Sequence, residues 1–324
     1  MANITFIIGN GLDISLGLKT KYTDFYNHVQ KNVKNSNNKI YKAIKDSPDS
    51  WSDFEKQLGA YTSYIKNPSE KKIREESIFF HSELEQVRND LADYLIEQEN
   101  DIENLSDRFG FNPSAYNDGL PSGQAPIIRN ALRDNHATVA SFITLNYTST
   151  LEKILEDDLI FQRLGWKSMT PFHVHGDVLE NMTLGVSSES QLYEGMSSEE
   201  KDDLIKIKQL QNLNENKVED LESIITRSKV IVIFGSSLGE TDEYIWSLVG
   251  SWLLFDSARR LVIHKRVENY SASIQRSPRE KRLITRSIQD KFLDRTEFTT
   301  DQKEDVRNQV FVAFNSEKLF YEKG

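Results

Sequence analysis

The sequence predicts an α/β protein with an open, mostly parallel β-sheet, helices on its faces and large helical insertions. The segments 4–8 and 230–234 carry no charge and are rich in β-branched and aromatic residues. This composition is typical of parallel strands that are buried on both faces. Each segment ends in glycines and polar residues and leads into a helical pattern. We expect one domain over 1–324, with helical insertions at 31–135 and 188–228.

Composition excludes several classes of protein. The 324 residues are 38% hydrophobic, enough for one large core with insertions. No apolar run is long enough to cross a bilayer, and the N-terminus leads directly into the first strand without a signal peptide, so we expect a cytoplasmic protein. The absence of cysteine excludes disulfides, thiolate catalysis and Cys-ligated zinc. The net charge of −10 argues against non-specific nucleic-acid binding.

The first strand ends in Gly9, Asn10 and Gly11, which predicts a turn into a helix. Backbone N–H groups at such a turn, with the helix dipole behind them, favour a phosphate. Asp13 then serves either as a first-turn acid or as a ligand of ribose hydroxyls. The pattern differs from the dinucleotide fingerprint G-x-G-x-x-G, because Ile14 stands at the third glycine position. A tight turn without a ligand is the alternative.

The region 31–135 predicts helices and no strand. It follows a helix indicated by Tyr22, Phe25 and Val29. After a loop with a short helical piece over 31–49, a helix begins at 51, and its Glu55 is interpreted as solvated rather than facing a site. The clearest helix covers 69–100, and its apolar face consists of Phe80, Leu84, Val87, Leu91, Tyr94 and Leu95. Glycines and prolines make 106–126 a loop.

The sheet resumes at 141–145 and is followed by Asn146. Ligands of open α/β sheets lie at the carboxyl ends of strands. The amide of Asn146 can hold a ribose hydroxyl or a water there, because it both donates and accepts hydrogen bonds. The alternative is that Asn146 or Thr148 caps the next helix.

The segment 172–177 is predicted to be a third strand that ends in polar residues. His173 and His175 alternate with Val174, so both are expected on one face. A metal pair is disfavoured because only Asp177 stands nearby as a third ligand, and we expect no metal. A catalytic role for His175 near neutral pH is favoured over that of a hydrogen-bonded structural histidine.

The remaining segments complete the predicted sheet. Residues 184–186 are a candidate edge strand, and 230–234 ends in the loop from Gly235 to Asp242, whose small residues allow close approach to a ligand. Strands at 261–263 and 310–314 follow, the latter at a sheet edge. The basic segment 266–292 is interpreted as a solvated helix face, with a phosphate, partner or nucleic-acid contact as the alternative.

Several of these motifs together resemble the AbiH family of bacterial phage-defence proteins. The resemblance rests on six segments whose order and spacing extend over nearly the whole chain: 6–13, 17–25, 51–55, 144–148, 175–176 and 235–242. Two positions depart from the family pattern, Leu12, where phenylalanine is usual, and Ser236, where histidine is common.

The AbiH family is in turn similar to sirtuins, which implies a Rossmann-like fold of the DHS-like NAD/FAD-binding type. In sirtuin-like domains an asparagine and a histidine before glycine flank the nicotinamide ribose, which implies that Asn146 and His175 are the catalytic pair. The stretch after Gly11 lacks the sirtuin pattern Gly-Ile-Pro-x-Phe-Arg. The resemblance implies NAD contacts by Gly9, Asn10, Gly11, Asp13, Thr20, Tyr22, Tyr147, Gly235, Ser236, Ser237 and Asp242.

The implied activity is hydrolysis of NAD to nicotinamide and ADP-ribose, which stops a phage by draining the cell of NAD. Deacylating sirtuins carry a four-cysteine zinc module, which this chain cannot build, so no zinc is expected and water is the expected acceptor. The first alternative is a nucleotide-binding sensor that regulates a partner effector without turnover. The second is a nuclease with Asp13, Asp242 and Glu243 around a metal, disfavoured by the acidic charge. A homo-oligomer is compatible with the helical insertions, and no membrane contact is expected.

Overall fold

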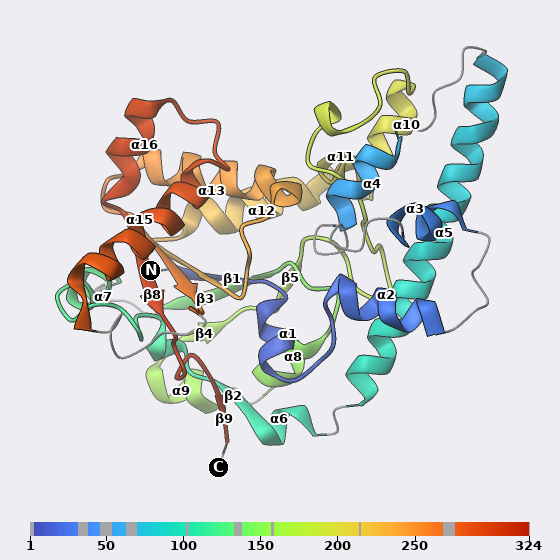
Figure 1. Cartoon of the computed structure of the whole chain (residues 1–324). Helices are drawn as coiled ribbons and strands as arrows, with labels where there is room; N and C mark the ends of the chain where they lie inside the picture. Colours follow the sequence, from blue (N-terminus) through green and yellow to red (C-terminus); the bar gives the residue numbers. More distant parts are fainter. Residues whose placement is uncertain are drawn as a thin grey trace.

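The computed structural model describes residues 3–31, 38–45, 54–62, 70–101, 104–132, 138–156, 159–213, 215–267 and 276–323. A seven-stranded sheet lies at its centre, in the order β4-β3-β1-β6-β7-β8, with β5 also paired to β3, and every pairing is parallel (Figure 1). Its strands are β1 (Asn3–Ile8), β3 (Val139–Thr144), β4 (Lys167–Ser168), β5 (Phe172–His173), β6 (Val230–Phe234), β7 (Arg260–Lys265) and β8 (Val310–Phe314). The predicted α/β class with a mostly parallel, Rossmann-like sheet and helical insertions is confirmed.

Helices cover both faces of this sheet, and further helices extend to one side of it (Figure 1). The α-helices are α1 (Gly11–Ser15), α2 (Tyr22–Lys31), α3 (Lys39–Lys45), α4 (Phe54–Thr62), α5 (Glu70–Asn100), α6 (Leu105–Arg108), α7 (Ala125–Ala131), α8 (Thr150–Leu155), α9 (Leu159–Leu164), α10 (Ser198–Asp202), α11 (Lys206–Leu213), α12 (Glu215–Arg227), α13 (Glu243–Phe255), α15 (Pro278–Leu293) and α16 (Thr300–Arg307). Short 3-10 turns lie at Pro113–Ala115, Glu189–Gln191 and Glu240–Asp242.

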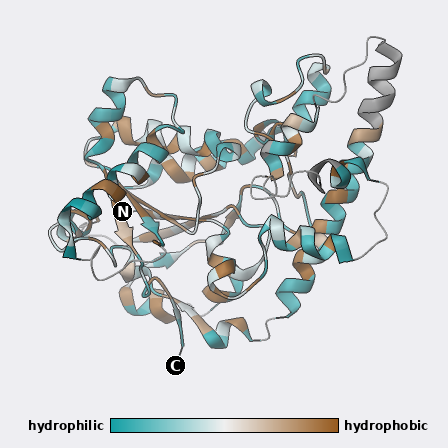
Figure 2. Ribbon diagram, viewed as in Figure 1, coloured by the Kyte–Doolittle hydropathy of each residue, from teal (hydrophilic) through white to brown (hydrophobic). Residues whose placement is uncertain are grey.

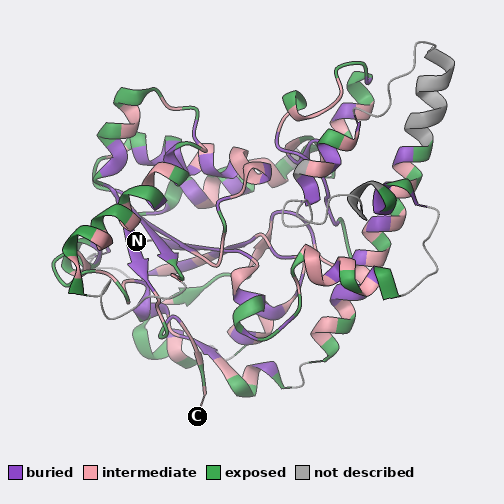
Figure 3. Cartoon of the chain, viewed as in Figure 1, coloured by how far each residue is buried: buried purple, intermediate pink, exposed green. Residues whose placement is uncertain are grey.

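The two faces of the sheet form separate cores because side chains alternate along each strand. Phe6 of β1 packs with Phe142 and with helices α1 and α6 to α9 on one face. Ile7 packs on the other face with α12, α13, α15 and α16, where Trp246 is fully buried. Figure 3 shows the strands as buried between these layers, and Figure 2 shows their apolar character against the mixed surfaces of the helices.

The first insertion has a core of its own. Helices α2 to α5 pack around Phe25, Phe54 and the predicted apolar face of α5, all of whose six residues are buried. Each such side chain contributes about 1.5–3 kcal/mol by leaving water. The same cluster includes Met196 and Leu204 of the second insertion, so the two insertions share one core.

Three local expectations are corrected by the structure. The region 31–135 contains a strand, β2 (Phe109–Phe111), which pairs antiparallel with β9 (Phe320–Glu322). Sequence patterns miss it because it is three residues long and its partner lies near the C-terminus. Residues 184–186 form no strand, only a single bridge from Val186 to Ile205, and the strand expected over 172–177 ends at His173.

The segment 51–53, where a helix was expected to begin, lies outside the described residues. Within the described part of the chain, no helix combines the length and the apolar character needed to cross a bilayer.

Candidate functional site

A cavity of about 1400 Å³ opens at the carboxyl ends of the parallel strands. Its walls come from residues after β1, β3, β6, β7 and β8 and from the helical insertions. All thirteen residues predicted for the site line it. They are Gly9, Asn10, Gly11, Asp13, Thr20, Tyr22, Asn146, Tyr147, His175, Gly235, Ser236, Ser237 and Asp242. The fold therefore brings together strand ends that are more than 200 residues apart in sequence.

The glycines after β1 and β6 serve a close contact between two backbone segments. Gly11 N–H donates to the Gly235 carbonyl at 2.7 Å, and Gly9 N–H donates to the Phe234 carbonyl at 2.9 Å. A Cβ added at Gly11 would lie 2.5 Å from Gly235 Cα, and Gly235 itself has φ +70°. Only glycine fits this contact. These two N–H groups are therefore occupied by the chain itself rather than directed at a phosphate.

Two hydrogen bonds between Asn10 and Thr20 hold the loop that follows α1 against the turn after β1. Thr20 Oγ1 donates to Asn10 Oδ1 at 2.5 Å, and Asn10 Nδ2 donates to the Thr20 carbonyl at 2.9 Å. Tyr94 of α5 fixes the preceding residue by donating to the Lys19 carbonyl at 2.6 Å. This arrangement fixes the backbone that leads to Tyr22.

Asp13 lines the cavity but is buried, with only 1% of its surface exposed. Its carboxylate accepts from Thr150 Oγ1 at 2.6 Å, from Thr148 Oγ1 at 2.7 Å and from Asn146 Nδ2 at 3.2 Å. Burial raises the pKa of Asp13 to about 6, although the hydrogen bonds from Thr150 and Thr148 oppose that rise. Because the carboxylate is occupied by these donors, Asp13 positions Asn146 within this wall.

Asn146 keeps one hydrogen-bonding atom without a partner. Its Nδ2 donates to Asp13, while its Oδ1 is buried with no hydrogen-bond partner among the described residues. The capping alternative is ruled out, because the N-cap of α8 is Ser149 and Thr148 donates to Asp13 instead. Buried polar atoms are normally satisfied, so this oxygen is left to accept a hydrogen bond from a water or a ligand in the cavity.

His175 lies past the end of β5 and is 3% exposed. Its Nε2 is 3.0 Å from Asp242 Oδ1, and its Nδ1 is buried with no hydrogen-bond partner in the described part of the chain. Burial opposes ionisation of Asp242, yet Lys206 and His175 hold the pKa of Asp242 well below its ordinary value. An ionised Asp242 favours the proton on Nε2 and leaves Nδ1 as an acceptor.

His173 belongs to a different environment. Its Nε2 lies 2.7 Å from Glu152 Oε1 of α8, and it is absent from the cavity lining. Burial acts to lower the pKa of His173, but the hydrogen bond that its ring donates to Glu152 outweighs this effect and raises the pKa. The two histidines thus contact different partners, Glu152 and Asp242, and of the two only His175 lines the cavity.

Glu55 is buried and faces the cavity, which corrects its interpretation as a solvated residue. It is 6% exposed, and its Oε2 accepts from Lys206 Nζ at 2.7 Å. Lys206, which is 2% exposed, also donates to Asp242 Oδ1 at 3.1 Å. A continuous chain of charged groups therefore joins α4 and α11, one from each insertion, to the loop after β6.

Further charged residues of both signs line the cavity. Lys265 ends β7 and Arg266 follows it, and Glu317 and Glu322 line the same space. Beside them, burial lowers the pKa of His264 to about 4, so this ring is neutral at physiological pH. Its Nε2 contacts the Tyr116 carbonyl at 2.9 Å.

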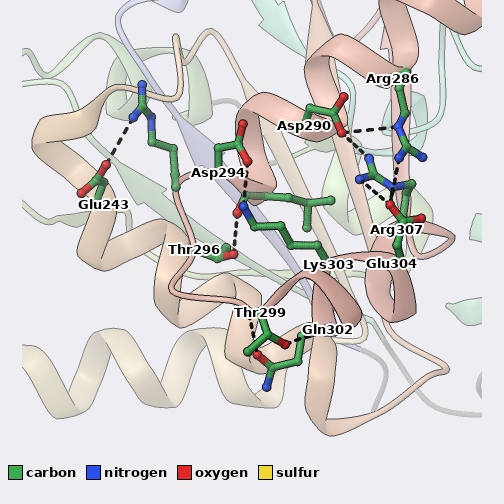
Figure 4. Close-up of polar contacts among 12 residues, drawn as sticks. Glu243, Arg286, Asp290, Asp294, Thr296, Thr299, Gln302, Lys303, Glu304 and Arg307 are labelled. Carbon is green, nitrogen blue, oxygen red and sulfur yellow. Dashed lines mark hydrogen bonds and ion pairs between the residues drawn. The ribbon is translucent and has the colours of Figure 1, made fainter.

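Much of the basic segment lies outside the cavity. On α15, Arg286 contacts Glu304 of α16 at 2.8 Å, and Asp290 contacts Arg307 at 2.6 Å (Figure 4). Lys303 and Asp294 add a further pair at 2.7 Å. These ion pairs join α15 to α16, so Arg286 of the basic segment is paired within the fold. Residues 268–275 of the same segment lie outside the described range.

No metal site emerges among the described residues: no group of three or more His, Asp or Glu side chains is arranged to hold an ion. Glu243, one of the three acids considered for a nuclease site, pairs with Arg295 at 3.3 Å.

A sequence model of the family described as bacteriophage abortive infection AbiH matches residues 5–264 of the chain. The chain belongs to the AbiH family. The resemblance read from the motifs is thus confirmed at the level of the family, which places the protein in phage abortive infection. No protein in a search of curated sequences matches it.

Among the lining residues of this AbiH cavity that sequence reasoning missed, Lys206 and His264 are both buried and ionisable. Lys206 stands within the apolar run Leu204-Ile205-Lys206-Ile207, and a lysine at such a place is a signal of a buried ion pair. His264 is the fifth residue of β7 and lies at its carboxyl end, where the rule of strand ends applies equally.

Proposed function

We propose that this AbiH protein binds NAD in the cavity and hydrolyses its glycosidic bond to nicotinamide. One observation carries the proposal: Asn146 Oδ1 and His175 Nδ1 are both buried, both lack a hydrogen-bond partner among the described residues, and both residues line the same cavity. These atoms are acceptors, and the reactive half of NAD offers ribose hydroxyls and an attacking water as donors. The cavity volume is ample for a dinucleotide.

In the proposed reaction, water replaces nicotinamide at C1′ of the ribose. The C1′–N bond breaks with its electron pair moving to the nicotinamide nitrogen, through an oxocarbenium-like state. Asn146 Oδ1 accepts a hydrogen bond from a ribose hydroxyl. His175 Nδ1 takes the proton of the attacking water, and Asp242 stabilises the imidazolium that forms. Loss of NAD from the cell then accounts for the abortive-infection role.

The test is direct. Purified protein is incubated with NAD, and nicotinamide and ADP-ribose are separated by chromatography. We expect turnover in the wild type and a loss of about 100-fold or more in His175→Ala, the lower range for a general base. Asn146→Ala is expected to fall similarly. Turnover that persists at the wild-type rate in both variants contradicts the assignment.

A second candidate is a sensor that binds the nucleotide without turnover and signals to a partner effector. It is favoured by the contribution of both insertions to the cavity wall through Glu55 and Lys206. A ligand that contacts Glu55 or Lys206 would therefore act directly on the positions of α4 and α11 in the two insertions. Stable binding of NAD with no release of nicotinamide distinguishes the sensor from the hydrolase.

A further inference from the structure

The charges of three cavity-lining residues that contact one another do not balance. Lys206 supplies one positive charge, while Glu55 and Asp242 supply two carboxylates within 2.7 Å and 3.1 Å of its ammonium. Lys206 is 2% exposed and Glu55 is 6% exposed. Among these three side chains one negative charge is left without a counter-charge, and burying an unpaired charge is costly.

The unmatched charge is located more closely by the contacts. Asp242 Oδ1 is shared between Lys206 Nζ and His175 Nε2, so Asp242 is already occupied. Glu55 uses Oε2 for Lys206, and its Oε1 is buried with no hydrogen-bond partner among the described residues. Glu55 therefore brings to the cavity both an unmet acceptor and an excess negative charge, a combination that suits a cationic ligand group.

We propose that Glu55 is a further catalytic residue that faces the positively charged half of the substrate, and that Lys206 is its positioning residue. The inference rests on the proposed function, since the nicotinamide ring of NAD is a pyridinium cation. When the C1′–N bond breaks, the positive charge passes from the ring to the ribose. A fixed carboxylate stabilises that charge before and during bond cleavage.

Lys206 acts through Glu55 rather than on the substrate. Its two hydrogen bonds fix the Glu55 carboxylate and join it to Asp242, which orients His175. Because Glu55 lies on α4 and Lys206 at the start of α11, both insertions are needed to complete the reactive end of the cavity. Hydrolysis would still consume only NAD and water, with the water proton passing to His175.

The first test measures charge preference without turnover. The probes are a carbocyclic NAD analogue, whose C1′–N bond resists hydrolysis, and its reduced form, whose ring is neutral. We expect the wild type to bind the cationic form more tightly by about tenfold or more. Glu55→Gln should remove this preference and leave the affinity for ADP-ribose unchanged. Glu189→Gln is the matched control, because Glu189, whose side chain is 66% exposed, pairs with Lys201 outside the cavity lining.

The second test separates catalysis from binding and from folding. We expect Glu55→Gln to lower kcat by about tenfold or more with a smaller change in KM. Glu55→Asp keeps the charge but withdraws the carboxylate by one methylene, so it should fold normally, retain the cationic preference and lose kcat. Lys206→Arg should restore most of the kcat that Lys206→Met loses.

The outcomes distinguish this inference from the hydrolase proposal. If NAD is not hydrolysed but the cationic preference is present and depends on Glu55, the hydrolase proposal fails and Glu55 remains the group that faces the cation. If NAD is hydrolysed and Glu55→Gln and Glu55→Asp both keep wild-type kcat and preference, the assignment of Glu55 is overturned. Equal binding of both ring forms by the wild type also overturns it.

Discussion

Replacing Lys206 by methionine removes the ammonium that contacts both Glu55 and Asp242 while keeping most of the side-chain volume. Lys206 is 2% exposed and contacts the two carboxylates at 2.7 and 3.1 Å. Without it both carboxylates stay buried with no ammonium beside them, and breaking such a buried pair costs about 3–5 kcal/mol. We therefore expect Lys206→Met to lower the free energy of unfolding by about this amount at neutral pH.

The pH dependence has a definite sign. In the folded wild type, Lys206 and His175 hold the pKa of Asp242 below its ordinary 3.8 against the effect of burial, so Asp242 contributes stability that is present above pH 3.8 and lost as the pH falls. Although burial opposes it, Asp242 and Glu55 raise the pKa of Lys206 above 10.5, so its contribution is present below pH 10.5 and lost as the pH rises further. The difference between wild type and variant should thus be largest between these limits and shrink in acid.

The assay is urea unfolding followed by tryptophan fluorescence at pH 7 and pH 3.5, with circular dichroism to check the fold. Lys201→Met is the matched control, five positions earlier, because Lys201 pairs with Glu189, which is 66% exposed. An exposed partner limits the loss to about 1 kcal/mol or less. The reasoning is refuted if Lys206→Met costs no more than Lys201→Met, or if its cost is the same at both pH values.

Two further predictions concern the turn after β1. In Gly11→Ala the new Cβ would lie 2.5 Å from Gly235 Cα, so we expect a loss of about 1–3 kcal/mol from overpacking. Gly123→Ala is the control, because no atom lies within 4 Å of the added Cβ, and its free energy of unfolding should stay within about 0.5 kcal/mol of wild type. Equal midpoints of urea unfolding for the two variants would contradict the close contact at Gly11. Burial raises the pKa of Asp13 from 3.8 to about 6, so ionising it costs the folded state about 3 kcal/mol above pH 6. Asp13→Asn removes that cost, and its stability relative to wild type should improve by about this amount from pH 4 to pH 7; a difference that is constant with pH would argue against the raised pKa.

Much of the sheet could be predicted from local patterns. The runs at 4–8 and 230–234 are buried strands because their uncharged side chains must leave water on both faces. The helix over 70–100 follows from the spacing of its apolar residues, of which Val87 is fully buried. Strand β2 could not be predicted, because three residues carry too little pattern and its pairing with β9 is set by tertiary contact.

The roles of individual site residues were less predictable than their positions. The rule of strand ends placed Asn146 and His175 at the cavity, but it could not show that Asp13 holds Asn146. Glycines after a strand are compatible with a phosphate turn or with a backbone contact, and only the distance from Gly11 to Gly235 decides for the contact. Glu55 was interpreted as solvated, because its burial depends on a lysine 151 residues away.

The sequence by itself determined the α/β class, the strand ends that line the cavity and membership of the AbiH family. These properties follow from short-range patterns of apolar, glycine and polar residues. Only the tertiary structure decided which polar atoms are satisfied and which are not. Asn146 Oδ1, His175 Nδ1 and Glu55 Oε1 have no hydrogen-bond partner in the described part of the chain. Their neighbours come from distant segments, and no local pattern records those distances.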